Sequence, residues 1–444
     1  MAMDTSTLPP PPVPDPWPAP TASGPIQAVV GLPGSKSQTN RALILAALGE
    51  RPSTLLLPLI SRDTLLMVQA LRALGATLDE QDQGWVVTPG ELHGPARVDA
   101  GLAGTVMRFV PPVAVLARGD VEVDGDPRAR DRPMRGLVEA LQSLGADLEA
   151  TSGTAGLGLP LRLHGRGSLA GGPVTVDASA SSQIVSGLLL AGARYDAGVR
   201  VRHQGAPIPS APHLAMTVAL LRQAGAQVDD TETDVWDVRP GPLHLGEVVI
   251  EPDLSNAAPF LGAAMVTAGH VRISGWPRVT TQPGDRLRDL LVAMGARVER
   301  HADGLSVHGP GTIHGVDVDL HEVGELTPVL AALAAVADRP SRLRGIGHLR
   351  GHETDRLTAL ATELSRLGAK VRVEPDGLTI VPRPLRPVLV RTYADHRLAT
   401  AAAVLGLVVP GLQVQDVATT AKTMPGFVEL WAQMLSGPPA GAPR

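Results

Sequence analysis

The sequence predicts an α/β fold of two domains, each built from three copies of a β-α-β-α-β-β unit, with a cleft between the domains. Two observations predict it. The chain has 444 residues, which exceeds the size of about 250–300 residues at which a single hydrophobic core stops growing. One sequence pattern also recurs about every 70 to 80 residues. This interval is too long for a solenoid, whose units have about 20–45 residues.

Each copy of the pattern has an apolar helical stretch, a glycine, and two alternating segments joined by a turn. Five copies are marked by Gly75, Gly145, Gly225, Gly295 and Gly368. A glycine just past a helix supplies the left-handed backbone conformation of that position. Alternating segments joined by Asp-Gly or Gln-Gly predict a β-hairpin. A sixth copy, which ends in FVELWAQML, completes the set.

The composition excludes several classes of function. There is no cysteine, so disulfides, thiolate nucleophiles and zinc-thiolate sites are ruled out, and a cytoplasmic location is expected. A net charge of −5 and only 2% aromatic residues argue against a nucleic-acid-binding surface. No apolar run is long enough to predict a membrane-spanning helix.

The first 24 residues contain many prolines and neither Lys nor Arg. A signal peptide begins with basic residues and a transit peptide is rich in Arg, so neither is expected. Because so many prolines cannot build a core, we expect residues 1–24 to form a disordered tail, partly in the polyproline II conformation.

Several polar strings interrupt the apolar repeat, and functional residues are expected there. The first string, GLPGSKSQTNRALILAAL, carries Lys36, Ser37 and Arg41 from a glycine-rich turn into a helix. Backbone donors, a helix N-terminus and cations together suit an anion. The string is not a Walker A loop, because Ser35 stands where a glycine must precede the lysine. Taken alone, a solvated loop is an equally good interpretation.

Three more strings lie in the first half of the chain. In GLAGTVMRF, Gly104 opens a helix that bears Arg108. In GDPRARDRPM, charged residues cluster around Arg132, and a solvated loop explains this cluster equally well. In ASASSQIVSG, a helix begins with short hydrogen-bonding side chains that suit a phosphate or a polyol, although capping alone explains one of them. These side chains are Ser181, Ser182 and Gln183.

The second half of the chain contributes four polar strings. GELTPVLAALAA places Glu325 at a helix start. In HETDRL, Glu353 and Arg356 are three residues apart and share a helical face, which a surface ion pair would also explain. ADHR supplies Arg397 and TTAKTMPGF supplies Lys422. No ligand spacing typical of a metal site appears among the histidines of this half. They include His314, His321, His348 and His352.

Each string lies where the repeat is expected to begin a helix of small residues. Pseudo-threefold packing would then direct the helix N-termini of each domain toward one face. Two such faces, opposed across the cleft, would form an anion site from helix dipoles and cationic side chains. The cations are Lys36, Arg132, Arg356, Arg397 and Lys422. Substrates with several negative charges are implied.

In this order along the chain, PGSKSQTNRAL, LAGTVMRF, RDRPM, SASSQ, HETDRL, ADHR and AKTMP resemble the signatures of the EPSP synthase family. The resemblance covers nearly all of the chain after residue 25. It implies the enolpyruvyl transferase fold, in which the chain crosses twice between the domains. The crossings are expected near residues 34–35 and 250–251, so residues 25–34 and 251–444 would form one domain and residues 35–250 the other.

The resemblance also implies the reaction. The enolpyruvyl (1-carboxyvinyl) group of phosphoenolpyruvate would be transferred to the 5-hydroxyl of shikimate 3-phosphate, giving 5-enolpyruvylshikimate 3-phosphate and phosphate. This is a step of the shikimate pathway, which leads through chorismate to the aromatic amino acids. The family mechanism is addition followed by elimination, without cofactor or metal. A monomer is expected, because one chain carries the complete set of signatures.

The family's site residues carry over onto matching positions. Phosphoenolpyruvate would be bound by Lys36, Gly104, Arg132, Gln183, Arg356, Arg397 and Lys422. Shikimate 3-phosphate would be bound by Ser37, Arg41, Ser181, Ser182, Gln183, Ser210, Glu325 and His352. The catalytic residues would be Lys36, Glu325 and Glu353. Glu353 would act as the base near the attacking hydroxyl, assisted by Lys36.

Four positions depart from the family pattern. Leu102 stands where Asn is frequent, and Glu325 is one methylene longer than the common Asp. His348 and His352 stand where Asn and Lys are frequent. If His352 faces a substrate phosphate, its charge is expected to vary near neutral pH.

Three other classes of protein would share some of these features. UDP-N-acetylglucosamine enolpyruvyl transferase shares the fold, but that family typically has a Lys-Asn pair and a loop cysteine, whereas Ser37 follows Lys36 here. A catalytically inactive anion-binding scaffold would not need Lys36, Glu353 and Lys422 together, and all three are present. A nucleic-acid enzyme on a related repeat fold is disfavoured by the charge and the few aromatic residues.

Overall fold

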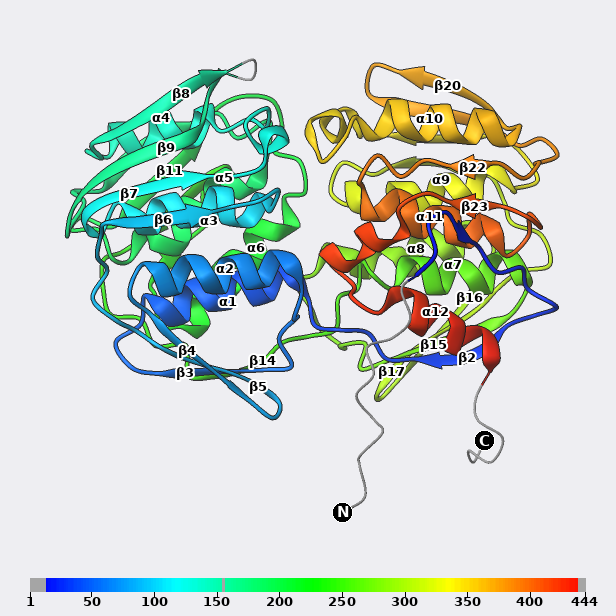
Figure 1. Cartoon of the computed structure of the whole chain (residues 1–444), viewed down its shortest axis with the longest axis horizontal. Helices are drawn as coiled ribbons and strands as arrows, with labels where there is room; N and C mark the ends of the chain where they lie inside the picture. Colours follow the sequence, from blue (N-terminus) through cyan, green and yellow to red (C-terminus); the bar gives the residue numbers. More distant parts are fainter. Residues whose placement is uncertain (1–12, 154–155, 438–444) are drawn as a thin grey trace.

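The computed structural model describes residues 13–153 and 156–437. Figure 1 shows two lobes that lie side by side and are joined by two chain crossings. The buried apolar side chains form two separate clusters, one drawn from residues 42–250 and the other from residues 17–30 and 254–434. No helix within the described ranges is long and apolar enough to cross a membrane.

The first lobe contains three four-stranded sheets, in the orders β14-β3-β5-β4, β6-β7-β9-β8 and β10-β11-β13-β12. In each sheet, two parallel strands are followed by an antiparallel hairpin. The strands are β3 (Ser53–Leu56), β4 (Thr77–Gln81), β5 (Gly84–Thr88), β6 (Ala96–Asp99), β7 (Arg118–Asp124), β8 (Leu148–Gly153), β9 (Gly156–Arg166), β10 (Gly172–Val176), β11 (Val199–His203), β12 (Val228–Asp229), β13 (Val235–Val238) and β14 (Glu247–Val249).

The second lobe contains sheets in the orders β16-β17-β15-β2, β18-β19-β21-β20 and β1-β23-β22. Its two four-stranded sheets repeat the arrangement of the first lobe. The strands are β1 (Trp17–Pro18), β2 (Gln27–Val30), β15 (His270–Ser274), β16 (Arg297–His301), β17 (Gly304–His308), β18 (Asp317–Asp319), β19 (Ser341–Arg344), β20 (Lys370–Glu374), β21 (Gly377–Val381), β22 (Leu389–Val390) and β23 (Gln413–Val414).

Three helices occupy the centre of each lobe. They are rich in Ala, Gly, Leu and Val and are buried along almost their whole length, as expected for helices that are apolar on every side. In the first lobe they are α1 (Lys36–Ala47), α3 (Gly104–Ala114) and α5 (Ser182–Gly192). In the second lobe they are α7 (Ala258–Thr267), α9 (Thr327–Ala335) and α11 (His396–Gly406).

The remaining helices contact these central helices or the sheets. They are α2 (Arg62–Ala73), α4 (Arg135–Ser143), α6 (Pro212–Gln223), α8 (Leu287–Ala293), α10 (Arg356–Leu367) and α12 (Phe427–Ser436). Short 3₁₀ helices are η1 (Pro127–Ala129), η2 (Pro283–Arg286), η3 (Gly324–Leu326), η4 (Gly347–Gly351) and η5 (Val417–Lys422).

The predicted repeat is confirmed in its marker glycines. Gly75, Gly145, Gly225, Gly295 and Gly368 have φ values of 113°, 99°, 88°, 102° and 122°. Each one ends a helix and precedes a strand. The left-handed conformation that the sequence pattern required is therefore present in all five copies.

The sixth copy differs from the prediction. Its sheet has three strands, and β1 comes from the N-terminal segment, with Trp17 opposite Val414 in antiparallel register. The Trp17 side chain is 5% exposed, and its ring lies 6.5 Å from that of Phe427, edge to face. The expectation of a disordered tail over residues 1–24 is therefore wrong for residues 13–24. Residues 1–12 lie outside the described ranges.

The two chain crossings contact each other. The backbone N–H of Ser35 donates to the carbonyl of Glu251 at 2.8 Å, and Gly34 forms an isolated antiparallel bridge with Pro252. A Cβ atom at residue 34 would lie 2.3 Å from the carbonyl oxygen of Leu57, so this close approach requires a glycine.

Candidate active site

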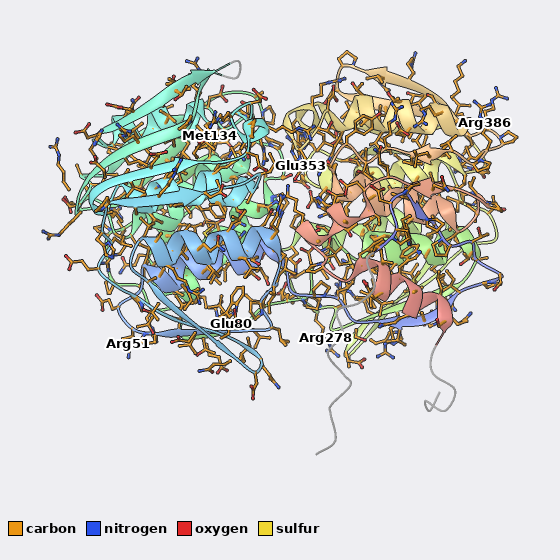
Figure 2. All side chains as sticks on the ribbon, viewed as in Figure 1. Arg51, Glu80, Met134, Arg278, Glu353 and Arg386 are labelled. Carbon is orange, nitrogen blue, oxygen red and sulfur yellow. The ribbon has the colours of Figure 1, made fainter. Side chains whose placement is uncertain are left out.

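A cavity of about 150 Å³ lies between the two lobes and is lined by residues of both. Every site residue that the sequence predicted lines this cavity. These residues are Lys36, Ser37, Arg41, Gly104, Arg132, Ser181, Ser182, Gln183, Ser210, Glu325, His352, Glu353, Arg356, Arg397 and Lys422. Figure 2 shows Glu353 between the lobes. The structure thus brings together side chains that are up to several hundred residues apart in the sequence.

In the first lobe, the central helices begin at the cavity, as the sequence predicted for both lobes; in the second lobe, only α11 begins at a lining residue, His396. The central helices α1, α3 and α5 begin at Lys36, Gly104 and Ser182, and all three residues line the cavity. Ser35 and Ser181 cap two of these helices by accepting from backbone N–H groups. The free N–H groups and positive dipole ends of such helices stabilise anions.

Three of the predicted cationic residues do not lie at the start of a helix of small residues, where the sequence analysis expected them. Arg132 precedes α4, Arg356 is the first residue of α10, and Lys422 ends η5. The prediction that every polar string begins a helix of small residues is therefore wrong for these three. These three residues lie on loops and outer helices, and their long side chains extend from there into the cavity.

In the second lobe, Arg356 and Asp395 form a buried ion pair. Arg356 donates from Nε to Asp395 at 2.7 Å and from Nη2 to Glu353, also at 2.7 Å. Asp395 has no exposed surface and also caps α11 by accepting from the backbone N–H of Arg397. Burial acts to lower the pKa of the Arg356 guanidinium, but Asp395 and Glu353 raise it overall. The cation is thereby held in one orientation.

Glu353 also accepts from Lys422, whose Nζ lies 2.5 Å from Glu353 Oε1. The same Nζ is 3.5 Å from the carbonyl oxygen of Leu102 in the opposite lobe. Burial would raise the pKa of the Glu353 carboxyl, yet Lys422 and Arg356 hold it well below its ordinary value. Glu353 is therefore ionised in this arrangement, and its negative charge is shared by two cations.

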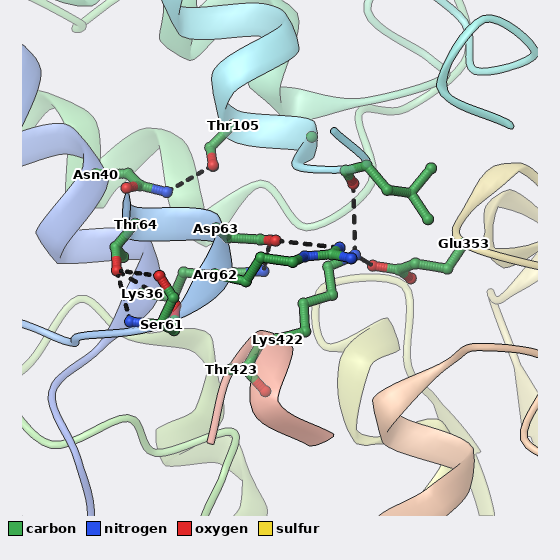
Figure 3. Close-up of polar contacts among 12 residues, drawn as sticks. Lys36, Asn40, Ser61, Arg62, Asp63, Thr64, Thr105, Glu353, Lys422 and Thr423 are labelled. Carbon is green, nitrogen blue, oxygen red and sulfur yellow. Dashed lines mark hydrogen bonds and ion pairs between the residues drawn. The ribbon is translucent and has the colours of Figure 1, made fainter. Parts of the chain in front are cut away.

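Asp63 is a residue of the site that the sequence analysis missed. Its carboxylate, which is fully buried, lies 3.2 Å from the Nζ of Lys36, and Arg62 lies 3.6 Å from its other oxygen. Figure 3 shows Lys36 against Asp63 on one side of the site and Lys422 against Glu353 on the other. An acidic residue in the first turn of a helix is usually explained by the helix dipole, so the sequence alone gave no signal for this role.

On the first-lobe side, Arg132 and Arg108 lie next to the N-terminus of α3. Arg132 Nη1 donates to the carbonyl of Leu102 at 3.1 Å, and Arg108 Nη1 donates to Gln183 Oε1 at 3.0 Å. The Nε atoms of both arginines are buried without a hydrogen-bond partner in the described part of the chain. Burial lowers the pKa of both guanidinium groups, so an anion placed next to them would compensate their buried charge.

Arg41 is 1% exposed and has no carboxylate partner among the described residues. Its guanidinium donates to Thr217 at 2.8 Å, to the carbonyl of Ser37 at 2.9 Å and to Ser186 at 3.2 Å. Burial lowers its pKa to about 9. A buried cation that is paired only with neutral groups favours a nearby substrate anion.

Two histidines that depart from the family pattern line the same cavity. Burial lowers the pKa of His348 to about 4. Burial, followed by the charge of Arg356, lowers the pKa of His352 well below its ordinary value. The ring is therefore neutral near pH 7 in the substrate-free arrangement. That its charge varies near neutral pH when it faces a substrate phosphate stays a prediction.

Other residues of the lining carried no recognisable signal in the sequence. Ser255 donates to Glu325 at 3.4 Å, and its carbonyl accepts from Arg397 at 2.9 Å. His213 lines the cavity beside Arg41.

Within residues 13–153 and 156–437, no group of three or more His, Cys, Asp or Glu side chains could hold a metal ion.

The cleft contains cationic side chains from both lobes, helix N-termini, hydroxyl groups and a buried carboxylate. Such a site is typical of an enzyme that acts on anionic substrates. A family model for EPSP synthase (3-phosphoshikimate 1-carboxyvinyltransferase) matches residues 20–431, so the chain belongs to this family. The reaction of the family is enolpyruvyl transfer from phosphoenolpyruvate to shikimate 3-phosphate, in the shikimate pathway. The predicted family, enzyme class and reaction are confirmed.

Solved structures agree with this fold. The EPSP synthase from Acinetobacter baumannii is 25% identical to this chain, and the match covers 93% of this chain and 97% of the other with a TM-score of 0.76. The enolpyruvyl transferase NikO from Streptomyces tendae is 19% identical, and its match covers 93% and 96% of the two chains with a TM-score of 0.75. The predicted enolpyruvyl transferase fold is confirmed.

Proposed function

We propose that the cleft binds phosphoenolpyruvate and shikimate 3-phosphate side by side and that residues of both lobes carry out the transfer. One observation carries the proposal: five cations from both lobes surround a cavity that also contains an ionised Glu353. They are Lys36, Arg132, Arg356, Arg397 and Lys422. Two bound substrates avoid a large entropic barrier, about 7–11 kcal/mol in favourable cases.

Phosphoenolpyruvate is assigned to the part of the cavity that contains Lys422, Arg356 and Arg132. One arginine comes from each lobe, and an arginine can donate paired hydrogen bonds to a carboxylate or a phosphate, the two anionic groups of phosphoenolpyruvate. The N-terminus of α3 at Gly104 adds backbone N–H donors. Because Gly104 has no side chain, a phosphate oxygen has room to approach these donors.

Shikimate 3-phosphate is assigned to the part lined by the N-terminus of α5. Ser181, Ser182 and Gln183 place hydroxyl and amide groups there. Ser37 and Arg41 lie next to this helix, because Arg41 donates to Ser186 of α5 and to the carbonyl of Ser37. Glu325, on η3, faces the same space and suits the ring hydroxyls. Ser210, in a left-handed conformation with φ of 53°, is also part of the lining.

The chemistry then follows from the charges. The 5-hydroxyl attacks C2 of phosphoenolpyruvate and gives its proton to Glu353, and Glu353 passes one proton to C3, which gives a tetrahedral ketal phosphate. The C2–O bond to phosphate then breaks, one proton of the C3 methyl group returns to Glu353, and the C2=C3 double bond forms again as phosphate leaves. Lys36, Lys422 and Arg132 stabilise the developing negative charge without reorganising.

Substrate binding would also prepare the base. In the substrate-free arrangement, Lys422 and Arg356 hold the pKa of Glu353 low, which makes its carboxylate a weak base. When the phosphate and carboxylate of phosphoenolpyruvate engage these cations, part of this stabilisation is lost and the pKa of Glu353 rises toward the range useful for proton transfer.

The domain boundaries belong to the same proposal. Residues 25–34 and 251–444, together with residues 13–24 that pack on the same lobe, would move against residues 35–250 about the contact between Ser35 and Glu251, closing the cavity on both substrates. One chain supplies the whole lining described above, which favours a monomer, and the absence of cysteine suits the cytoplasm. Size-exclusion chromatography with light scattering tests the monomer.

The test of the function is phosphate release by the purified full-length chain. Phosphoenolpyruvate is supplied with shikimate 3-phosphate, without it, or with UDP-N-acetylglucosamine as the alternative acceptor, each in the presence of EDTA. We expect release only with shikimate 3-phosphate. Release with UDP-N-acetylglucosamine alone would reject the acceptor assignment, and no release with either acceptor would reject the proposed function.

A further inference from the structure

One turn beside the proposed phosphoenolpyruvate site has a conformation that its residues rarely adopt. It lies between β22 and α11, and the backbone N–H of Asp395 closes it by donating to the carbonyl of Thr392 at 2.9 Å. The two central residues, Tyr393 and Ala394, have φ values of 55° and 56°. A turn with two positive φ values resembles type I′, in which Gly, Asn or Asp normally occupies these positions. Contacts outside the turn must therefore hold it in this form.

Helix α10 holds both ends of the turn. At one end, Arg356 donates to the carboxylate of Asp395 at 2.7 Å. At the other end, the carboxylate of Glu363 accepts from the hydroxyl of Tyr393 at 2.8 Å and from the backbone N–H of Arg391 at 3.2 Å. Glu363 follows Arg356 by about two helical turns, so both side chains leave the same face of α10.

The hydrogen bond between Tyr393 and Glu363 is protected from water. Glu363 is 4% exposed, and its carboxylate also pairs with Arg366. Burial, and then the hydrogen bond to Glu363, raise the pKa of the Tyr393 phenol, so this hydroxyl keeps its proton and donates it. Hydrogen bonds to a carboxylate are stronger than those between neutral groups, and this one therefore suits the task of holding a strained backbone.

The residue that ends the turn orients two arginines of the cavity. Asp395 binds Arg356 and also caps α11 by accepting from the backbone N–H of Arg397 at 2.9 Å. Both arginines line the cavity. A change in the backbone of the turn would move the Asp395 carboxylate, and with it the guanidinium group of Arg356 and the start of the helix that carries Arg397.

We propose that Glu363 and Tyr393 are positioning residues that act through the turn on the binding of phosphoenolpyruvate. They hold the left-handed backbone, which fixes the carboxylate of Asp395 and thereby the orientation of Arg356. This inference rests on the proposed function, in which that arginine binds phosphoenolpyruvate. Neither positioning residue belongs to the described lining of the cavity. Shikimate 3-phosphate, which is assigned to the N-terminus of α5, should not depend on them.

The main test is Tyr393→Phe, which keeps the ring and removes only the hydroxyl. We expect the KM for phosphoenolpyruvate to rise about three- to tenfold, equivalent to about 0.7–1.4 kcal/mol, because the turn loses one of its outside contacts. Phosphate release at saturating shikimate 3-phosphate gives this KM. The Kd for shikimate 3-phosphate, measured by calorimetry without phosphoenolpyruvate, should be unchanged.

Arg366→Ala is the matched control. It also removes one partner of the Glu363 carboxylate, but it leaves both hydrogen bonds to the turn in place, so the KM for phosphoenolpyruvate should not change. An equal rise of the KM in both variants would overturn the inference. A lower urea midpoint of Tyr393→Phe with an unchanged KM would show that the contact serves only stability, and would overturn it as well.

A second substitution tests the conformation of the turn itself. Glycine adopts positive φ values without the steric cost that Ala394 meets, so adding Ala394→Gly to Tyr393→Phe should return the KM for phosphoenolpyruvate to within about twofold of the unmodified chain. A KM that stays raised in the double variant would reject the turn as the route of the effect. An unmodified chain that releases no phosphate with shikimate 3-phosphate would reject the proposed function and this inference together, whereas an active chain with the same KM in every variant would reject the inference alone.

Discussion

Lys422 Nζ lies 2.5 Å from Glu353 Oε1 and 3.5 Å from the carbonyl oxygen of Leu102 in the opposite lobe. One ammonium group therefore joins the proposed base to the other side of the cleft. Because Glu353 is at the same time bound to Arg356, a single carboxylate pairs with two of the cations proposed to bind phosphoenolpyruvate and compensates only half of their charge.

The first prediction concerns Glu353 itself. Glu353→Gln keeps the shape and removes the base, so kcat should fall by about 100-fold or more, the range of general-base catalysis. Loss of the negative charge leaves Lys422 and Arg356 free for the substrate, so the KM for phosphoenolpyruvate should not rise. Steady-state phosphate release gives both values. Near-normal kcat would remove Glu353 from the role of base.

The second prediction concerns Asp63. Asp63→Asn removes the buried carboxylate beside Lys36, and Lys36 loses a charge-assisted contact of about 1.5–3 kcal/mol. We expect kcat to fall roughly 10- to 100-fold with little change in the KM for phosphoenolpyruvate. Arg62→Ala is the matched control, because Arg62 is half exposed and only flanks Asp63. An equal loss in both variants would contradict a specific role for Asp63.

The third prediction concerns the space at Gly104. A Cβ atom there would lie 2.8 Å from Arg132 Nη2 and 3.0 Å from Gln183 Oε1. Gly104→Ala should therefore displace Arg132 and raise the KM for phosphoenolpyruvate about tenfold, a change of about 1.4 kcal/mol. Gly31→Ala is the control, since a Cβ atom at Gly31 meets nothing within 4 Å. Unchanged kinetics in Gly104→Ala would show that this space is not used.

The fourth prediction concerns pH and stability. The pKa of His348 is about 4 in the folded chain, against about 6.5 when unfolded. The unfolded state therefore binds more protons below pH 6.5, and stability is lost as the pH falls from about 6.5 to 4, by up to about 1.4 kcal/mol per pH unit. His348→Asn should show a smaller loss between pH 7 and pH 5 in urea unfolding. An equal loss in the two proteins would contradict the shift.

The fifth prediction concerns the N-terminal strand. Trp17 is buried against Phe427, and removing such a side chain costs about 3–5 kcal/mol. Trp17→Ala should therefore lower the urea midpoint clearly, whereas Ser23→Ala, at an exposed position of the same segment, should leave it unchanged. If the N-terminal segment did not pack on the rest of the lobe, the two variants would have the same urea midpoint.

The sequence was most informative where a residue's conformation or chemistry is determined locally. The glycines that end helices, such as Gly75, have a left-handed conformation, and a few residues of sequence around each one are enough to predict it. The polar strings were recognisable because charged and hydroxyl side chains interrupt an apolar repeat. The assembly of these strings at one cavity follows from the repeat, which places the starts of α1, α3 and α5 together.

The sequence was least informative where the structure depends on distant partners. β1 has two residues, one of them proline, and therefore shows no alternation. Only its pairing with Val414 makes it a strand. Asp63 resembles any acid at a helix start until Lys36 is placed beside it. The low pKa of His352 depends on burial and on Arg356, whose orientation in turn depends on Asp395, so no single motif predicts it.

The pairing of β2 with β15 has a consequence for synthesis on the ribosome. The segment up to residue 34 emerges first, yet its partners β15 and β23 emerge only after residues 35–250. The lobe formed by residues 42–250 has its own apolar core and its own sheets, so it can form while the earlier segment is still unpaired. Residues 13–34 therefore complete their contacts last, when β23 and then α12, which carries Phe427, have left the ribosome.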